Sequence, residues 1–166
     1  GHDSWVFSMK PEYIYDTGRL TLNLRHSEIV DENPGALDLE TWSTNPRVSD
    51  PTKRTRYDSK QTHISLTWVS NLSDATIIIA KLFGQRRESY VNSFWGNSKI
   101  EQPSRGYAFE ISVDKNFLDL PHEFIIGHEL ETRDYNNIAE NWGDLFMDWK
   151  NTSFFIQDRF PLLENT

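Results

Sequence analysis

Cysteine is absent from this sequence, which excludes a disulfide framework and any zinc site built from thiolates. A chain without cysteine is also typical of proteins that assemble in a reducing compartment. The sequence has no run of eighteen apolar residues and no charged-then-apolar leader, so we expect neither membrane insertion nor an export signal. Its first two residues, Gly1 and His2, are typical of the remainder of an expression tag.

Basic residues are also scarce. The chain has 17 Lys and Arg against 25 Asp and Glu, for a net charge of −8, and the basic residues are scattered. This pattern argues against the clustered positive charge that contacts a phosphate backbone, so no nucleic-acid partner is expected. A length of 166 residues without a second hydrophobic block indicates a single domain, spanning residues 1–166.

Sequence motifs for catalysis and for metal binding are missing as well. The chain has no G-x-S-x-G nucleophile motif and no glycine-rich phosphate loop. In "HEFIIGHE", His122 and His128 stand six residues apart, whereas metallopeptidases place two histidines four apart on a helix. We therefore predict no enzymatic activity, no metal and no cofactor. A glycoside-processing enzyme is the alternative, and it requires two carboxyl groups about 5 to 10 Å apart across a cleft.

What the sequence does have is period-two alternation interrupted by turn residues. Short alternating segments occur at residues 5–9, 19–25, 63–69, 89–94, 107–113 and 123–126. The segment 63–69 is followed by a turn and by the apolar "ATIIIAKLF", which predicts a hairpin. Short strands at regular spacing favour an all-β fold, and we predict a two-sheet antiparallel β-sandwich with a short C-terminal helix or tail.

Two segments do not follow the alternating pattern. Residues 43–62 are polar and contain prolines, so we predict a long exposed loop. Residues 137–149 have apolar side chains at helical spacing, but Gly143 favours a turn followed by the strand "LFMDW". Two sequons, at Asn71 and Asn151, are glycan acceptors only in a secreted chain.

The segment from residue 86 to residue 107 combines aromatic rings with amides, carboxylates and guanidinium groups. Sugar sites need these groups, because a ring stacks on the apolar side of a pyranose and paired donors and acceptors bind its hydroxyls. Trp95 fits either a core role or a stacking role, and the turn residues that follow it favour exposure. The candidate ligand-binding residues are Arg87, Tyr90, Asn92, Trp95, Glu101 and Arg105.

Part of this segment is similar to a known family. Val91-Asn92-Ser93, then Trp95-Gly96, Glu101 and the strand "YAFEISV" resemble the second half of the galectin carbohydrate-recognition domain. In that family a strand ends in a ligand-binding asparagine, and a stacking tryptophan precedes glycine and glutamate. The resemblance implies a galectin-like sandwich that binds a carbohydrate without a metal.

A second resemblance covers residues 3 to 166. "DSWVFSMKP", "QTHISLTWVSN" and "SFFIQDR" resemble the beginning, middle and end of the trypsin-released head domain of rotavirus outer-capsid spike proteins. This resemblance implies a galectin-like fold, a location on the virion outer capsid, and attachment to a host glycan receptor as part of a spike assembly. Weak single sites would then act together through avidity.

Two other functions compatible with the same fold stay open. A cellular galectin-like lectin, cytoplasmic or secreted, would bind β-galactosides, and lactose would compete with its ligand. A protein-binding β-sandwich without a sugar site is the second, because one fold hosts unrelated functions.

Overall fold

The computed structural model describes residues 2–35, 43–44, 50–93, 95–117 and 120–160, and nearly all of them lie in β-strands. The prediction of an all-β fold is therefore confirmed. No helix in the described part of the chain is both long and apolar enough to cross a membrane. The strands are β1 (His2–Met9), β2 (Glu12–Tyr15), β3 (Gly18–Gly35), β4 (Asp50–Ser73), β5 (Thr76–Ser93), β6 (Gly96–Phe117), β7 (Leu120–Ala139) and β8 (Leu145–Arg159).

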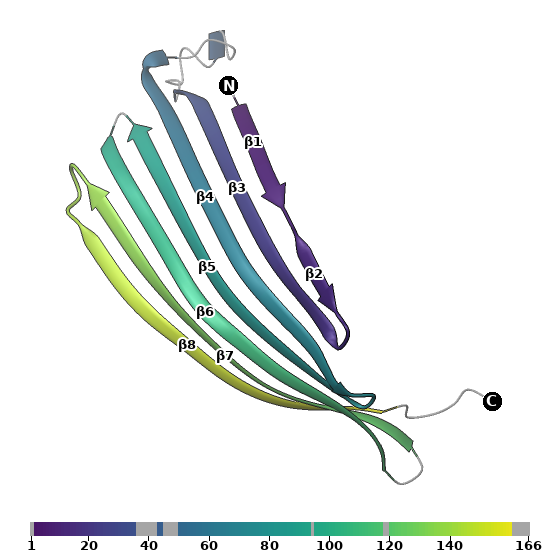
Figure 1. The fold of residues 1–166 in the computed structure, drawn as a ribbon. Helices are drawn as coiled ribbons and strands as arrows, with labels where there is room; N and C mark the ends of the chain where they lie inside the picture. Colours follow the sequence, from purple (N-terminus) through teal and green to yellow (C-terminus); the bar gives the residue numbers. More distant parts are fainter. Residues whose placement is uncertain (1, 36–42, 45–49, 94, 118–119, 161–166) are drawn as a thin grey trace.

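These strands form one antiparallel sheet in the order β1-β3-β4-β5-β6-β7-β8, with β2 also on β3 (Figure 1). β1 and β2 pair with successive parts of β3, so that Trp5 lies opposite Glu28 and Tyr13 opposite Leu20. Pro11, which has no N–H to donate, separates β1 from β2. Its carbonyl still accepts a hydrogen bond from the Leu22 N–H at 3.0 Å. The two-sheet sandwich is not seen among the described residues.

Several sequence predictions about local structure are confirmed. β4 and β5 form the expected hairpin, with a turn at Asp74 and Ala75. The segment after residue 139 is a turn followed by a strand that begins at Leu145. Gly143 has φ of +79°, in the left-handed region that glycine adopts at no steric cost. The turn is therefore encoded locally.

The loop predicted for residues 43–62 is wrong over its larger part. β4 begins at Asp50, and its first half pairs with β3 and β5 through contacts such as Tyr57 with Asp31 and with Val91. The segment shows no apolar alternation because both of its faces are mostly polar, so its strand structure is determined by the partner strands. Residues 45–49 lie outside the described residues.

The helix predicted at the C-terminal end is absent from the described residues. The last described element is β8, which ends at Arg159 and pairs with β7 along its whole length. Residues 161–166, which include the predicted tail, lie outside the described part of the chain.

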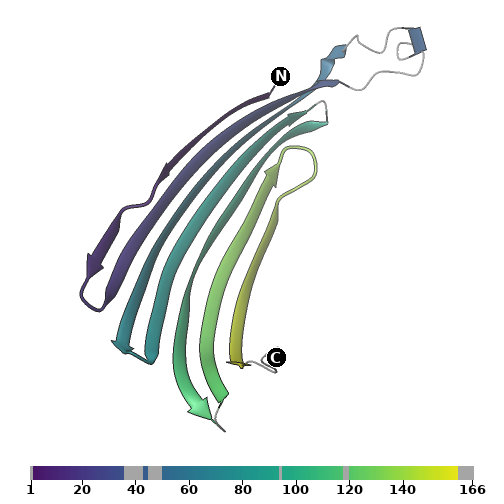
Figure 2. The ribbon, with the colours of Figure 1, turned by 90° about the vertical axis from the view of Figure 1, so that its right-hand side faces the viewer.

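The sheet is strongly curved (Figures 1 and 2), and its two faces differ in exposure. From Lys60 to Trp68 in β4, the even-numbered side chains are exposed and the odd-numbered ones are buried or half-buried. Side chains on the inside of a bend crowd one another, so we assign the odd-numbered side of β4 to the concave face. The register then assigns the side chains of the other strands to the concave or the convex face, because directly paired residues share a face.

The distribution of polarity over these two faces is the reverse of that in most globular proteins. Of the hydrophobic residues that the structure describes, only Ile125 is buried, and the other buried residues include Ser59, Ser65 and Ser89. All four lie on the concave face. On the convex face, large apolar side chains are exposed, including Leu82 at 60% and Ile156 at 80%. The edge strands depart from this pattern, because Val6 in β1, Ile14 in β2 and Leu145, Met147 and Trp149 in β8 are exposed on the concave side.

Candidate functional site

An apolar band runs across the convex face at the end of the sheet that holds the Asp16-Thr17 and Asp74-Ala75 turns. It crosses all of the strands from β1 to β8, and register places its members in neighbouring rows. The described residues include no second layer that covers it. Its exposed members are Phe7, Met9, Tyr13, Ile64, Leu66, Trp68, Leu82, Tyr107, Phe109, Ile126, Phe154 and Ile156.

Aromatic rings with polar tips stand at both margins of this band. At the turn end, the Trp68 indole N–H donates to the Tyr15 hydroxyl, which donates to the Val69 carbonyl at 3.3 Å. At the opposite margin, the Trp5 indole N–H donates to the Glu28 carboxylate at 3.0 Å. Trp and Tyr side chains are enriched at boundaries where the ring lies in apolar surroundings and its polar group reaches water.

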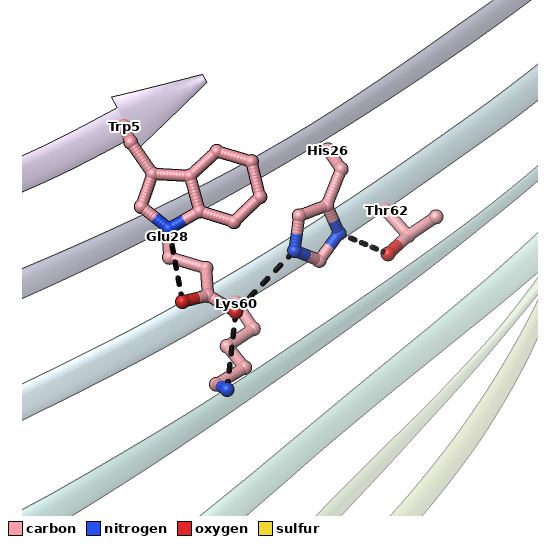
Figure 3. Close-up of polar contacts among 5 residues, drawn as sticks. All are labelled: Trp5, His26, Glu28, Lys60 and Thr62. Atoms are coloured by element: carbon pink, nitrogen blue, oxygen red, sulfur yellow. Dashed lines mark hydrogen bonds and ion pairs between the residues drawn. The ribbon is translucent and has the colours of Figure 1, made fainter. Parts of the chain in front are cut away.

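A polar band continues on the convex face beyond Trp5, toward the other end of the strands. Figure 3 shows Glu28 between three partners: Trp5, Lys60 at 3.1 Å and His26 at 3.4 Å. The other nitrogen of His26 lies 2.8 Å from the Thr62 hydroxyl. The hydrogen bond from Lys60 lowers the pKa of the Glu28 carboxyl, and Glu28 in turn raises the pKa of Lys60. Both groups are therefore held in their charged forms at neutral pH.

A second ion cluster extends the polar band over β5 and β6. Arg86 contacts Glu88 at 2.6 Å and Glu101 at 3.8 Å, and Lys99 contacts Glu101 at 2.5 Å. The Lys99 ammonium also lies 5.6 Å from the centre of the Tyr90 ring. The hydrogen bond from Lys99 lowers the pKa of Glu101. Most of the charged side chains in this polar band therefore form ion pairs with one another.

The six residues proposed from the sequence do not form one site. Register places Tyr90, Asn92, Glu101 and Arg105 on the convex face, with Tyr90 and Glu101 joined through Lys99. Arg87 lies on the concave face, where it donates to the Tyr57 hydroxyl at 2.8 Å. Trp95 lies in the turn between β5 and β6 and is 70% exposed.

The β5–β6 turn is joined to the neighbouring β7–β8 turn, and each carries an exposed tryptophan. The Asn141 amide donates to the Trp95 carbonyl at 2.8 Å, and the Asn97 amide donates to the Glu140 carboxylate at 3.3 Å. Trp142 follows Asn141 and is 80% exposed. No sequence pattern indicates this pairing, because Trp95 and Trp142 are 47 positions apart and only the antiparallel order of the strands brings their turns together.

On the concave face, a hollow of about 370 Å³ lies over β3, β4 and β5. Register places Arg25 opposite His63, and His63 opposite Gln85. In the next row, Gln61 lies opposite Arg87. Sequence reasoning missed this hollow because its residues come from three strands and no motif joins them. The hollow is lined by Asn23, Arg25, Ser27, Gln61, His63 and Gln85.

Another hollow, of about 580 Å³, lies at the ends of β6, β7 and β8. It contains His122, which contacts Asp158 at 3.0 Å, and Glu123, which contacts Arg159 at 3.1 Å. These contacts engage four of the polar side chains with one another, and Asp114 and Lys115 also line the hollow. Among the described residues, no three His, Asp or Glu side chains are grouped so as to hold a metal ion.

No family model, curated protein or solved structure matches this chain. Function is therefore inferred from the geometry of the sheet, since a fold alone does not specify a function.

Proposed function

We propose that the convex face of the sheet contacts the hydrocarbon of a lipid membrane, so that the sheet acts as a membrane-embedded wall with a polar concave face. The observation that carries this proposal is the reversed polarity, in which Leu82 and Ile156 are exposed while Ser65 and Ser89 are buried. A face in contact with hydrocarbon must be apolar, whereas a face in contact with water tolerates hydroxyls and charges.

The energetic cost of the alternative, a bare convex face in water, is large. Full burial of one Val, Leu, Ile, Phe or Met side chain is worth about 1.5–3 kcal/mol. Monomers in water seldom expose continuous apolar patches larger than a few hundred Å². The apolar band crosses every strand of the sheet, so it requires a cover.

Hydrocarbon fits the dimensions and the margins of this band. In β4, the convex side chains from Thr62 to Ser70 cover nine residues, and strands embedded in a membrane use about 9–11 residues. Trp68 and Tyr15 at one margin and Trp5 at the other place polar tips where lipid headgroups begin. Glu28, Lys60, Glu88 and Glu101, in the row of Trp5, then lie outside the hydrocarbon. On β5, β6 and β8 the hydrocarbon begins nearer the turns, beyond Arg86, Arg105 and Lys150.

This proposal departs from the sequence-based expectation of no membrane insertion. That expectation depended on the absence of a long apolar run, but in a strand only every second residue faces one side. Hydrocarbon supplies no hydrogen bonds, so the outer edges of β1, β2 and β8 must pair with other strands. A second sheet over the convex face, as in the predicted sandwich, is the competing cover.

The test is quenching of tryptophan fluorescence by lipids with brominated acyl chains. In single-tryptophan variants refolded into vesicles, we expect Trp68 on the convex face to be quenched strongly. Trp149 on the concave face and Trp142 in a turn serve as matched controls and should be quenched weakly. The physical reason is that bromine quenches only on close contact.

Equal quenching of Trp68, Trp142 and Trp149 would contradict the proposal. Absence of quenching at Trp68, combined with a blue-shifted emission, would favour a second sheet over the convex face.

A second candidate function, glycan binding, is favoured by the exposed pair Trp95 and Trp142. Two rings on adjoining turns offer the stacking surface that a pyranose needs. The neighbouring Asn97 and Glu140 supply amide and carboxylate groups for the hydroxyls. Attachment to a host glycan, as in the spike head that the sequence resembles, is one form that this second candidate function would take.

For glycan binding, we expect Trp95→Ala and Trp142→Ala each to weaken the response on a glycan array by about fivefold, the loss of one aromatic contact. Trp149→Ala, which removes a ring from the concave face, is the control. Competition by lactose would indicate a galectin-like preference for β-galactosides. Unchanged binding in both turn variants would exclude this stacking site.

A further inference from the structure

We infer that the hollow on the concave face, between β3, β4 and β5, binds the oxyanion group of a polar ligand, a carboxylate or a phosphate. The inference concerns only the concave face and does not depend on what contacts the convex face. It rests on three observations: a guanidinium group in the hollow and a second at its margin, neither with an ion-pair partner among the described residues; amides around the first; and a difference in charge between the two sides of the concave face.

The first observation concerns Arg25 and Arg87. Within the described residues, neither guanidinium forms an ion pair, whereas Arg56, Arg86, Arg133 and others do. Arg25 is exposed toward the hollow, and Arg87 donates to the uncharged Tyr57 hydroxyl. A guanidinium presents five N–H donors in a fork that matches the geometry of a carboxylate or phosphate.

The second observation is the set of groups that surrounds these cations. His63 lies directly between Arg25 and Gln85 in one row of the sheet, and Gln61 lies between Ser27 and Arg87 in the next. Paired Cα atoms in antiparallel strands are about 4.5–5.5 Å apart, so Arg25, His63, Gln85, Ser27 and Gln61 line one small volume, and Arg87 lies at its margin. Amides, imidazole and a hydroxyl add hydrogen-bond donors without negative charge.

The third observation is the charge distribution on the concave face. In the rows around the hollow, β3, β4 and β5 contribute Arg25, His63 and Arg87 and no carboxylate. Two strands away, β7 contributes Glu129, Glu131 and Arg133 to the same face, and Arg133 pairs with Glu131 at 2.8 Å. The charge is therefore more positive over β3–β5 than over β7, where one carboxylate remains in excess, and an anion is favoured over β3–β5.

The ligand class follows from these donors. An uncharged sugar would satisfy the amides but would leave the charges of Arg25, in the hollow, and of Arg87, at its margin, without a counter-charge. A cation would be repelled by them. A small oxyanion, or a larger polar molecule that carries one, satisfies both, and the volume of about 370 Å³ admits several non-hydrogen atoms beyond the anionic group.

The test is calorimetric titration of the refolded full chain with citrate, with inorganic phosphate and with glucose. We expect citrate and phosphate to bind and glucose not to bind. Arg25→Gln should weaken anion binding about tenfold or more, because a hydrogen bond to a charged group is lost. Arg25→Lys should weaken it less, because the charge remains while the fork is lost.

Arg105→Gln is the matched control, because Arg105 lies opposite Gly84 on the convex face and its loss changes the net charge equally. It should leave anion binding within about twofold of the original, the effect of long-range charge alone. Circular dichroism confirms that each variant is folded. Equal losses in Arg25→Gln and Arg105→Gln, or binding of glucose as strong as that of citrate, would overturn the inference.

Discussion

Replacement of Leu82 by lysine is expected to destabilise the sheet in lipid vesicles by about 2–4 kcal/mol, the cost of a charge on a lipid-facing strand near the middle of the membrane. Leu82 is 60% exposed on the convex face of β5. The same change at a water-exposed position alters the free energy of unfolding by no more than about 0.5 kcal/mol. The free energy of unfolding, from urea titration followed by tryptophan fluorescence, separates these values.

Two neighbours in β8 supply a matched control. Ile156 lies on the convex face and Gln157 on the concave face, at the same level of the sheet. Ile156→Lys should therefore be destabilising, whereas Gln157→Lys should be close to neutral. The chain already contains a lysine on the concave face next to an apolar residue on the convex face, since Lys81 precedes Leu82 in β5. A Leu82→Lys variant as stable as the original chain would mean that the convex face contacts water.

Gly106→Ala should destabilise the sheet by about 1–3 kcal/mol, the usual cost of overpacking. A Cβ atom at Gly106 would lie 2.2 Å from the Leu130 carbonyl oxygen and 2.6 Å from the end of the Phe83 ring. The ring can move, but the carbonyl belongs to the backbone of β7, so the two strands would have to separate locally. The free energy of unfolding in urea measures the loss.

Gly84 is the matched control for this substitution, since it lies one row away in the adjacent strand β5. A Cβ atom there meets nothing closer than Ile64 at 3.7 Å, an ordinary van der Waals contact. Gly84→Ala should be neutral or stabilise by about 0.4–1 kcal/mol, because alanine restricts the unfolded chain. Equal stability of Gly84→Ala and Gly106→Ala would show that close strand approach does not constrain Gly106.

The candidate glycan residues show how far local pattern extends. Alternation within β5 correctly separates Arg87 from Tyr90, since their positions differ by an odd number. It does not indicate that Lys99 and Glu101 of β6 come to lie beside Tyr90, which depends on the register of β5 with β6. The joined turns of Trp95 and Trp142 depend in the same way on the order of four strands.

The segment from Asp50 to Thr62 shows the opposite limit. Its polar side chains and its proline favour a loop, and nothing within the segment predicts a strand. It is extended because β3 and β5 continue on either side and pair with its backbone. Backbone pairing of this kind is indifferent to side-chain polarity, so the pattern of the sequence could not reveal it.

By itself, the sequence determined the elements and their two-sidedness. Alternating Leu20, Leu22 and Leu24 defined one face of a strand, and Gly143 defined a turn, because these signals depend only on backbone geometry within a few residues. Only the tertiary structure decided which face lies inside. Alternation is symmetric with respect to the two sides of a sheet, whereas curvature crowds one side and opens the other, and here Leu66 and Leu82 are exposed and Ser59, Ser65 and Ser89 are buried.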